Sequence, residues 1–158
     1  MNLTKRIAQT IGTFFFIGYF PIFPATIGSL AGLALYILLV TKVAALSSFG
    51  VAWVILLALI FLVSVWAART CEAIYGIDDR HIVIDEVWGM LIGLQSMDLK
   101  PWLLLGAFLV FRAIDIIKPY PIRRAEKIGG GFGVVLDDGI AGIYTALVML
   151  LVRALLVH

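Results

Sequence analysis

The sequence is poor in charged residues and in the residues that form cross-links. Only 14% of its 158 residues are charged, and it has one cysteine and two histidines. A lone cysteine, Cys71, excludes an intramolecular disulfide and a cysteine-rich metal site, so we expect it to be a small filler at a helix end. Low-complexity stretches and repeats of solenoid period are also missing, which predicts a single domain over residues 1–158.

Apolar residues are in large excess. They make up 63% of the chain, and the mean hydropathy is +1.09, far outside the usage of soluble proteins. Five apolar stretches are candidates to cross a membrane, although the third is shorter and carries two acids near its start. They are residues 27–40, 49–68, 82–97, 101–117 and 140–157.

The amino-terminal residues 3–20 are apolar too, but Gly12 and Gly18 interrupt them and Pro21 follows. This stretch lacks the cleavage pattern of a signal peptide, so we expect an interfacial or partly inserted helix. The predicted fold is therefore all-α: a polytopic membrane helical bundle of about five transmembrane helices plus an amino-terminal interfacial helix.

Basic residues alternate between the loops that five spans would create. Nine fall on the side of the amino terminus, and three fall on the other side. The first group is Lys5, Arg6, Arg69, Arg80, Arg112, Lys118, Arg123, Arg124 and Lys127, and the second is Lys42, Lys100 and Arg153. The positive-inside rule then predicts that the nine-residue side faces the cytoplasm.

Acidic residues gather on the same side, at or just inside the ends of the spans. Seven of them do so, and only Asp98 clearly lies opposite; the seven are Asp78, Asp79, Asp85, Glu86, Asp115, Asp137 and Asp138. Ionisable groups within spans are costly and usually face a polar cavity, so the clustering suggests a functional site. A set of juxtamembrane salt bridges, or the ion path of a small transporter or channel subunit, is the alternative interpretation.

Two acidic pairs stand at the same predicted depth. Asp85 and Glu86 begin the third stretch, while Asp137 and Asp138 precede the last one. Neighbouring carboxylates suit a hard cation with oxygen ligands such as Mg²⁺, which keeps waters and phosphate oxygens in its shell. A shared metal site is therefore plausible. His81, without partner cysteines or a second nearby histidine, is read as an interfacial residue.

Three further patterns could hold a phosphate. Arg112, Asp115 and Lys118 recur every three residues, which predicts a polar stripe on a helix that Pro119 ends, either an internal salt-bridge ladder or a phosphate grip. Thr26 could cap the first long helix with Ser29 near its positive end. The glycine-rich stretch 129–133 could admit a head group or form a flexible loop.

These blocks resemble the bacterial phosphatidylglycerophosphatase A family. The resemblance covers nearly the whole chain in the family's order, through residues 21–30, 82–89 (IVIDEVWG), 111–122 (FRAIDIIKPYPI) and 130–142 (GGFGVVLDDGIAG). It implies a Mg²⁺-dependent phosphatase of the bacterial cytoplasmic membrane that converts phosphatidylglycerophosphate to phosphatidylglycerol in phospholipid biosynthesis. One departure is Ala25, where the family usually has glycine between proline and threonine. The expected partners are this lipid and the membrane, not nucleic acid.

The site hypothesis assigns each group a role. Metal ligands would be Asp85, Glu86, Asp137 and Asp138; catalytic residues would be Asp85, Asp115 and Asp137; substrate-binding residues would be Thr26, Ser29, Arg112, Lys118 and Arg123. Attack by a metal-activated water and attack by a carboxylate both stay open, as do the number of metal ions and the oligomeric state. The acidic motif of CDP-alcohol phosphotransferases fits less well, because Gly142 stands where that motif has arginine.

Overall fold

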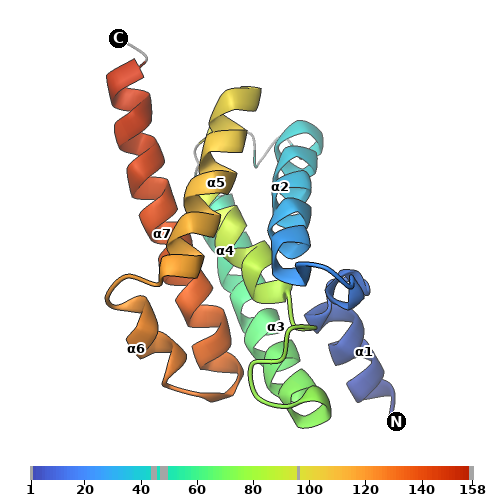
Figure 1. The fold of residues 1–158 in the computed structure, drawn as a ribbon. Coiled ribbons are helices and arrows are strands. Elements are labelled where there is room, and N and C mark those ends of the chain that lie inside the picture. Colours follow the sequence, from blue (N-terminus) through green and yellow to red (C-terminus); the bar gives the residue numbers. More distant parts are fainter. Residues whose placement is uncertain (1, 44–45, 47–49, 96, 157–158) are drawn as a thin grey trace.

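The fold consists of α-helices. The computed structural model describes residues 2–43, 46, 50–95 and 97–156; residues 49, 96 and 157, which belong to three of the predicted spans, lie outside this part. Within it are seven α-helices, one 3₁₀ helix and no strand, which confirms the all-α class (Figure 1). The order is α1 (Leu3–Gly12), η1 (Ile17–Tyr19), α2 (Pro24–Lys42), α3 (Val51–Tyr75), α4 (Ile84–Leu94), α5 (Pro101–Ile117), α6 (Ile122–Glu126) and α7 (Gly130–Leu156).

Three helices are long and apolar enough to cross a membrane: α2 with 19 residues, α3 with 25 and α7 with 27. The chain is therefore a membrane protein by the length and composition of its helices. The expected five spans are not confirmed, because α5 has 17 residues and α4 only 11. The interfacial role of α1 also stays a prediction.

Helix α4 occupies the centre of the bundle. At a rise of about 1.5 Å per residue it is roughly 16 Å long, about half the hydrocarbon thickness. It packs against α2, α3, α5 and α7 (Figure 1), and every residue of it except Trp88 is buried. The longer helices thus cover an apolar helix that is too short to span the bilayer, which explains why its sequence resembles a weak transmembrane segment.

Glycines let the backbones around α4 approach closely. A Cβ at Gly142 of α7 would lie 2.3 Å from the carbonyl oxygen of Gly89, and one at Gly89 would lie 2.5 Å from that of Asp138. On the other side of α4, a Cβ at Gly32 of α2 would meet Val87 and Met90 at 2.9 Å. The small-residue spacing of α2 is therefore used for packing inside one chain.

The glycine-rich block before the last span is largely helical. Helix α7 begins at Gly130, ten residues before the predicted span, and Gly131 packs on α3, where a Cβ would lie 2.3 Å from the backbone nitrogen of Arg69. A loop over 129–133 was therefore the wrong interpretation. The early start puts Asp137 and Asp138 inside the helix rather than at its beginning.

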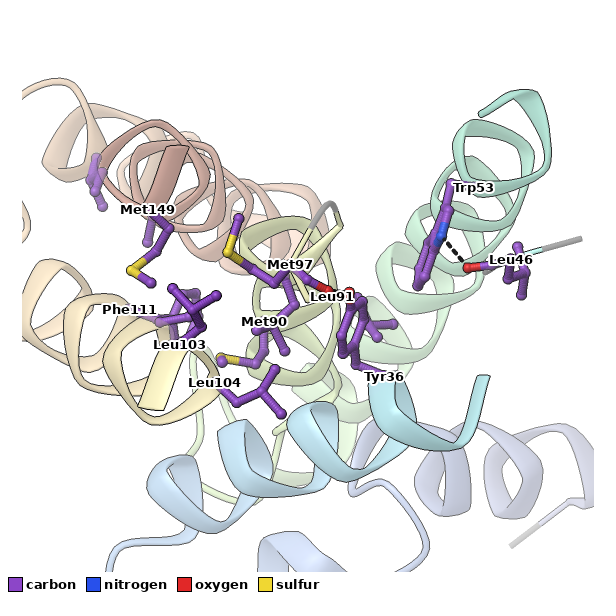
Figure 2. Close-up of a cluster of buried hydrophobic side chains, with 14 residues drawn as sticks. Tyr36, Leu46, Trp53, Met90, Leu91, Met97, Leu103, Leu104, Phe111 and Met149 are labelled. Carbon is purple, nitrogen blue, oxygen red and sulfur yellow. Dashed lines mark hydrogen bonds between the residues drawn. The ribbon is translucent and has the colours of Figure 1, made fainter. Parts of the chain in front are cut away.

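The main apolar core lies between α4 and its neighbours (Figure 2). Met90 and Leu91 of α4 meet Tyr36, Phe111 and Met149, all at most 3% exposed. Tyr36 Oη donates to the carbonyl oxygen of Met97 at 2.5 Å, so the one polar atom of this ring is satisfied. Cys71 belongs to a second buried cluster with Val135, consistent with its expected filler role.

Candidate functional site

Three buried carboxylates from two helices meet in the bundle. Asp85 and Glu86 stand in the first turn of α4, and Asp138 faces them from α7; one oxygen from each lies within 4.8 Å of the others. Their exposed fractions are 6%, 8% and 4%. The amino terminus of α4 favours negative charge, and the Gly89–Gly142 contact brings α7 close enough to add the third carboxylate.

This group is suited to a divalent cation. Among the described residues, Asp85 Oδ1 and Glu86 Oε2 are buried without a hydrogen-bond partner. Burying carboxylates without compensation is costly, and three of them repel one another. Oxygen ligands of this kind are those that Mg²⁺ uses. The donor set and its unpaired oxygens therefore fit a bound metal ion.

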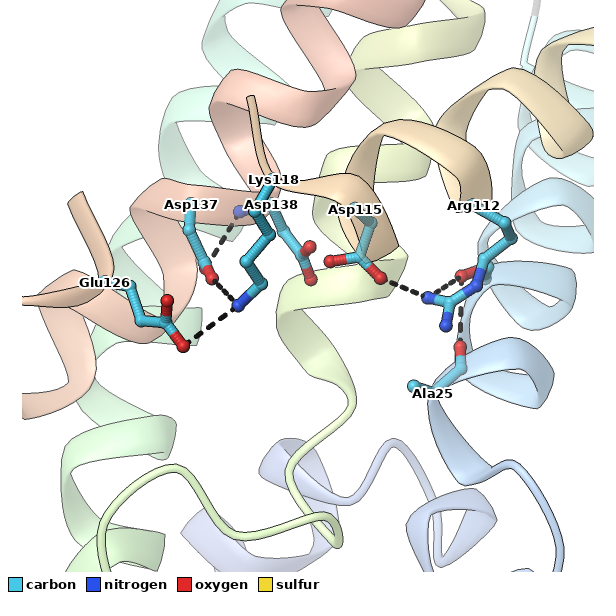
Figure 3. A network of polar contacts seen from close by, with 8 residues as sticks. Ala25, Arg112, Asp115, Lys118, Glu126, Asp137 and Asp138 are labelled. Carbon is cyan, nitrogen blue, oxygen red and sulfur yellow. Dashed lines mark hydrogen bonds and ion pairs between the residues drawn. The ribbon is translucent and has the colours of Figure 1, made fainter. Parts of the chain in front are cut away.

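Arg112 and Asp115 form an ion pair beside Asp138 (Figure 3). Arg112 Nη1 lies 2.6 Å from Asp115 Oδ2 and 3.4 Å from Ser29 Oγ, and both charged side chains are only 15% exposed. Ser29 in turn donates to the carbonyl oxygen of Ala25 at 3.0 Å. Arg112 Nε has no partner in the described structure, so the guanidinium keeps a donor for an anion.

Lys118 forms a second ion-pair group next to the first. Its Nζ lies 2.9 Å from Asp137 Oδ2 and 3.1 Å from Glu126 Oε1 (Figure 3). Partial burial disfavours the ammonium, but the two carboxylates outweigh this and raise the pKa of Lys118 above its ordinary value. Lys118 has a left-handed backbone that ends α5, which turns its side chain toward α7. The cation is therefore fixed in its charged form.

The predicted site residues divide into a central and a peripheral set. The structure brings Asp85, Glu86 and Asp138 together, and Asp115 adds its charge to those of Glu86 and Asp138. Asp137 stands apart from the three, because its Oδ2 pairs with Lys118 and its Oδ1 accepts from the N–H of Asp138 at 2.9 Å.

The amino-terminal block differs from the expectation. Thr26 does not cap α2: the cap is Phe23, with a left-handed backbone, and Pro24 occupies the first turn, a position that proline favours. Ala25 lies in the first turn of α2, where the backbone does not require glycine. Arg123 is exposed and donates to the carbonyl oxygen of Ile117 at 3.2 Å, which places it at the end of α5.

Two pairings escaped the sequence reasoning. Glu126 forms the second ion pair of Lys118. The only signal in the sequence is that Glu126 follows Lys118 by eight residues. Asp79 pairs with His81, which packs on the rings of Tyr19 and Tyr75 at 4.9 and 5.3 Å. Partial burial opposes the charge of Asp79, but hydrogen bonds from His81 outweigh it and lower the pKa of the carboxyl.

The fold and site define a class: an all-helical membrane protein with a buried carboxylate group beside two ion-paired cations. Residues 10–153 match the profile of the phosphatidylglycerophosphatase A family, and the chain belongs to this family. No solved structure matches it.

Three curated relatives are similar to the chain. A Haemophilus influenzae phosphatidylglycerophosphatase A is 39% identical over 82% of the chain and 78% of its own length, and the Escherichia coli phosphatidylglycerophosphatase A is 33% identical over 82% and 73%. A Bacteroides thetaiotaomicron protein provisionally named a phosphatidylinositol-3-phosphatase is 36% identical over 97% of the chain and 98% of its own length.

Proposed function

We propose that the chain is a Mg²⁺-dependent phosphatase that hydrolyses the terminal phosphomonoester of phosphatidylglycerophosphate, giving phosphatidylglycerol and inorganic phosphate in phospholipid biosynthesis. Family membership and the names of two relatives support the substrate. The observation that carries the chemistry is the group Asp85, Glu86 and Asp138, whose unpaired oxygens lie beside the ion pairs of Arg112 and Lys118.

The buried carboxylates would hold the metal ion. Asp85, Glu86 and Asp138 are its ligands in this proposal, and Asp137 supports them from the neighbouring position on α7. Bound Mg²⁺ would neutralise charge on the phosphoryl oxygens, as metal ions do in other phosphoryl transfers.

Arg112 and Lys118 would receive the phosphate. Arg112 has a free Nε donor, and its guanidinium geometry suits two phosphoryl oxygens. Lys118 adds a point charge that its partners keep protonated. Ser29 fixes Arg112 from α2, while Thr26 and Arg123 lie at the periphery of the binding region in this proposal.

Asp115 would orient Arg112 and act on a proton of the attacking water. In the overall reaction the water oxygen forms a bond to phosphorus, the ester bond from phosphorus to the glycerol oxygen breaks, and a proton ends on the leaving hydroxyl. Asp115 pairs with Arg112, and its carboxylate points toward that of Asp138 (Figure 3). Direct attack by Asp85 or Asp137, with an aspartyl-phosphate intermediate, is the alternative route.

The site would face the cytoplasm of a bacterial inner membrane. The helix ends that carry Lys42, Lys100 and Arg153 lie at one end of the bundle, while α1, α6 and the α3–α4 connection lie at the other (Figure 1). The excess of basic residues at the second end supports its cytoplasmic placement. Labelling of a cysteine introduced at Lys127 from the periplasmic side alone would contradict it.

The decisive experiment is phosphate release by the purified protein in detergent. Phosphatidylglycerophosphate, phosphatidic acid and phosphatidylinositol 3-phosphate are compared, each with Mg²⁺ and with a chelator. We expect release that needs Mg²⁺ and is fastest from phosphatidylglycerophosphate. Faster release from phosphatidylinositol 3-phosphate would instead favour the activity for which the Bacteroides relative is named. No release from any lipid by folded protein would reject the phosphatase.

A further inference from the structure

An apolar groove runs along the outside of the bundle between α2 and α5. It has a volume of about 440 Å³, and its lining includes Leu30, Leu33, Ile37, Leu104, Leu105 and Phe108. Its lining is almost entirely apolar, and Leu30, Ile37 and Leu105 are 42%, 38% and 57% exposed. In a membrane protein this surface faces lipid, so the groove is open to hydrocarbon chains.

The groove leads to the candidate site on both helices. On α5, Leu104, Leu105 and Phe108 follow helical spacing, and Arg112 continues it one turn further. On α2, Ser29 stands four residues before Leu33, and Thr26 stands four residues before Leu30. Ser29 and Arg112 contact each other across the two helices at 3.4 Å. On both helices the apolar lining is therefore followed, one turn further, by the residues of this polar contact.

The dimensions match one leaflet. From Pro101, which also lines the groove, to Arg112 the helix rises about 16 Å, at 1.5 Å per residue. This is roughly half of the ~30 Å hydrocarbon thickness. An acyl chain that extends from a phosphate at Arg112 along the groove would thus cover about half of the hydrocarbon thickness.

We propose that this groove binds one acyl chain of the phospholipid substrate and so directs its terminal phosphate toward Arg112. The occupant is identified by the continuity of an apolar groove with a cationic end, which is the shape of an anionic phospholipid. The proposal rests on the proposed phosphatase function and adds to it the route by which the lipid is held. Helices α2 and α5 then act together as the lipid clamp of the enzyme.

A matched pair of substitutions on α5 tests the clamp by activity. Leu105 lines the groove and Leu109 does not, yet both are 57% exposed leucines of the same helix. Leu105→Trp should lower the ratio of kcat/KM for a long-chain to a dihexanoyl phosphatidylglycerophosphate about tenfold, the loss of roughly two buried methylene groups. Leu109→Trp should leave this ratio as in the unmodified protein. Equal ratios in both variants would overturn the proposal.

Photolabelling tests the groove without hydrolysis. Phosphatidylglycerophosphate with a photoreactive group in mid-chain should label peptides of α2 and α5 in preference to those of α3, and unlabelled substrate should compete. Even labelling of all three helices would reject the groove. Preferential labelling by protein that releases no phosphate would retain the groove and reject the phosphatase, so the two failures are distinguishable.

Discussion

The two ends of the bundle contain the same types of charged residue in opposite settings. At one end Asp98 lies 3.5 Å from Arg153 and 4.0 Å from Lys100, and these side chains are 39–50% exposed. At the other, Asp85, Glu86 and Asp138 are at most 8% exposed, and two of their oxygens have no protein partner among the described residues. Exposed ion pairs are worth little, whereas buried like charges need compensation. Burial without pairing therefore makes the second end the candidate functional site.

The largest effect is expected from removing one charge at the buried end. Asp138→Asn should lower kcat/KM for phosphatidylglycerophosphate by roughly 10³-fold or more, as loss of a central catalytic group does in other hydrolases. The reason is that one of only three gathered carboxylates is lost. Asp98→Asn at the other end is the matched control and should stay within about twofold of the unmodified enzyme.

The same substitution should not lower the stability of the metal-free protein. Asp138→Asn removes repulsion among buried carboxylates, so in chelator the variant should unfold at the same or a higher temperature than the unmodified protein. With Mg²⁺ at about 100 times its Kd, the unmodified protein should gain roughly 2.7 kcal/mol, and the variant much less. A large loss of stability in chelator would mean that Asp138 is a structural residue.

The second effect concerns Arg112, whose guanidinium is proposed to bind the phosphate. Arg112→Lys keeps the positive charge but loses the fork and the contacts with Asp115 and Ser29. We expect kcat/KM to fall about 100-fold, similar to the loss of one oxyanion donor. Arg153→Lys provides the comparison at the other end. If Arg112→Lys hydrolyses the lipid at an unchanged rate, the phosphate does not bind at Arg112.

The sequence was sufficient for the helical class and for three of the four carboxylates predicted to share a site, namely Asp85, Glu86 and Asp138. Apolar stretches and acidic pairs predicted membrane helices with charges at one end, and Arg112 indeed pairs with Asp115 at a spacing of three. The carboxylates Asp85 and Glu86 stand in the first turn of α4, as their position before an apolar run suggested.

The sequence was insufficient for the features that depend on how the helices pack. Hydropathy cannot distinguish a short helix buried by other helices from one that spans the bilayer, so α4 was counted as a span. The left-handed backbone of Lys118 turns its side chain away from the Arg112 stripe, and this determines that Asp137 is ion-paired whereas Asp138 is not. Glu126 came from a short helix that no pattern predicted.

A smaller effect is expected at the periphery of the active end. Lys118→Met should reduce kcat/KM about tenfold, since one phosphate-directed charge is lost while Arg112 remains. Glu126→Gln, at a side chain that is 41% exposed, should lower kcat/KM only about twofold.

The pH dependence gives a separate test of Lys118. Because the pKa of Lys118 is raised, its stabilising ion pairs are fully present below the unfolded pKa of about 10.4. We therefore expect kcat to show no ionisation of this lysine between pH 6 and 9. If the unmodified enzyme loses activity between pH 6 and 9 and Lys118→Met does not, Lys118 is not a permanently charged residue of the site.

The smallest effect on activity is expected from a substitution that loosens the contact between α4 and α7. Gly89→Ala places a Cβ 2.5 Å from the carbonyl oxygen of Asp138, so α4 and α7 must separate. Overpacking of this kind costs about 1–3 kcal/mol, measurable as a lower midpoint of unfolding in detergent. Gly106→Ala is the matched control, because its Cβ would meet only the flexible end of Met149 at 3.5 Å, an ordinary contact. If separation of the helices also weakens metal binding, Gly89→Ala should need more Mg²⁺ for half-maximal activity, whereas Gly106→Ala should not. Equal stability of the two variants would show that the close approach of α4 and α7 is not what holds the three carboxylates together.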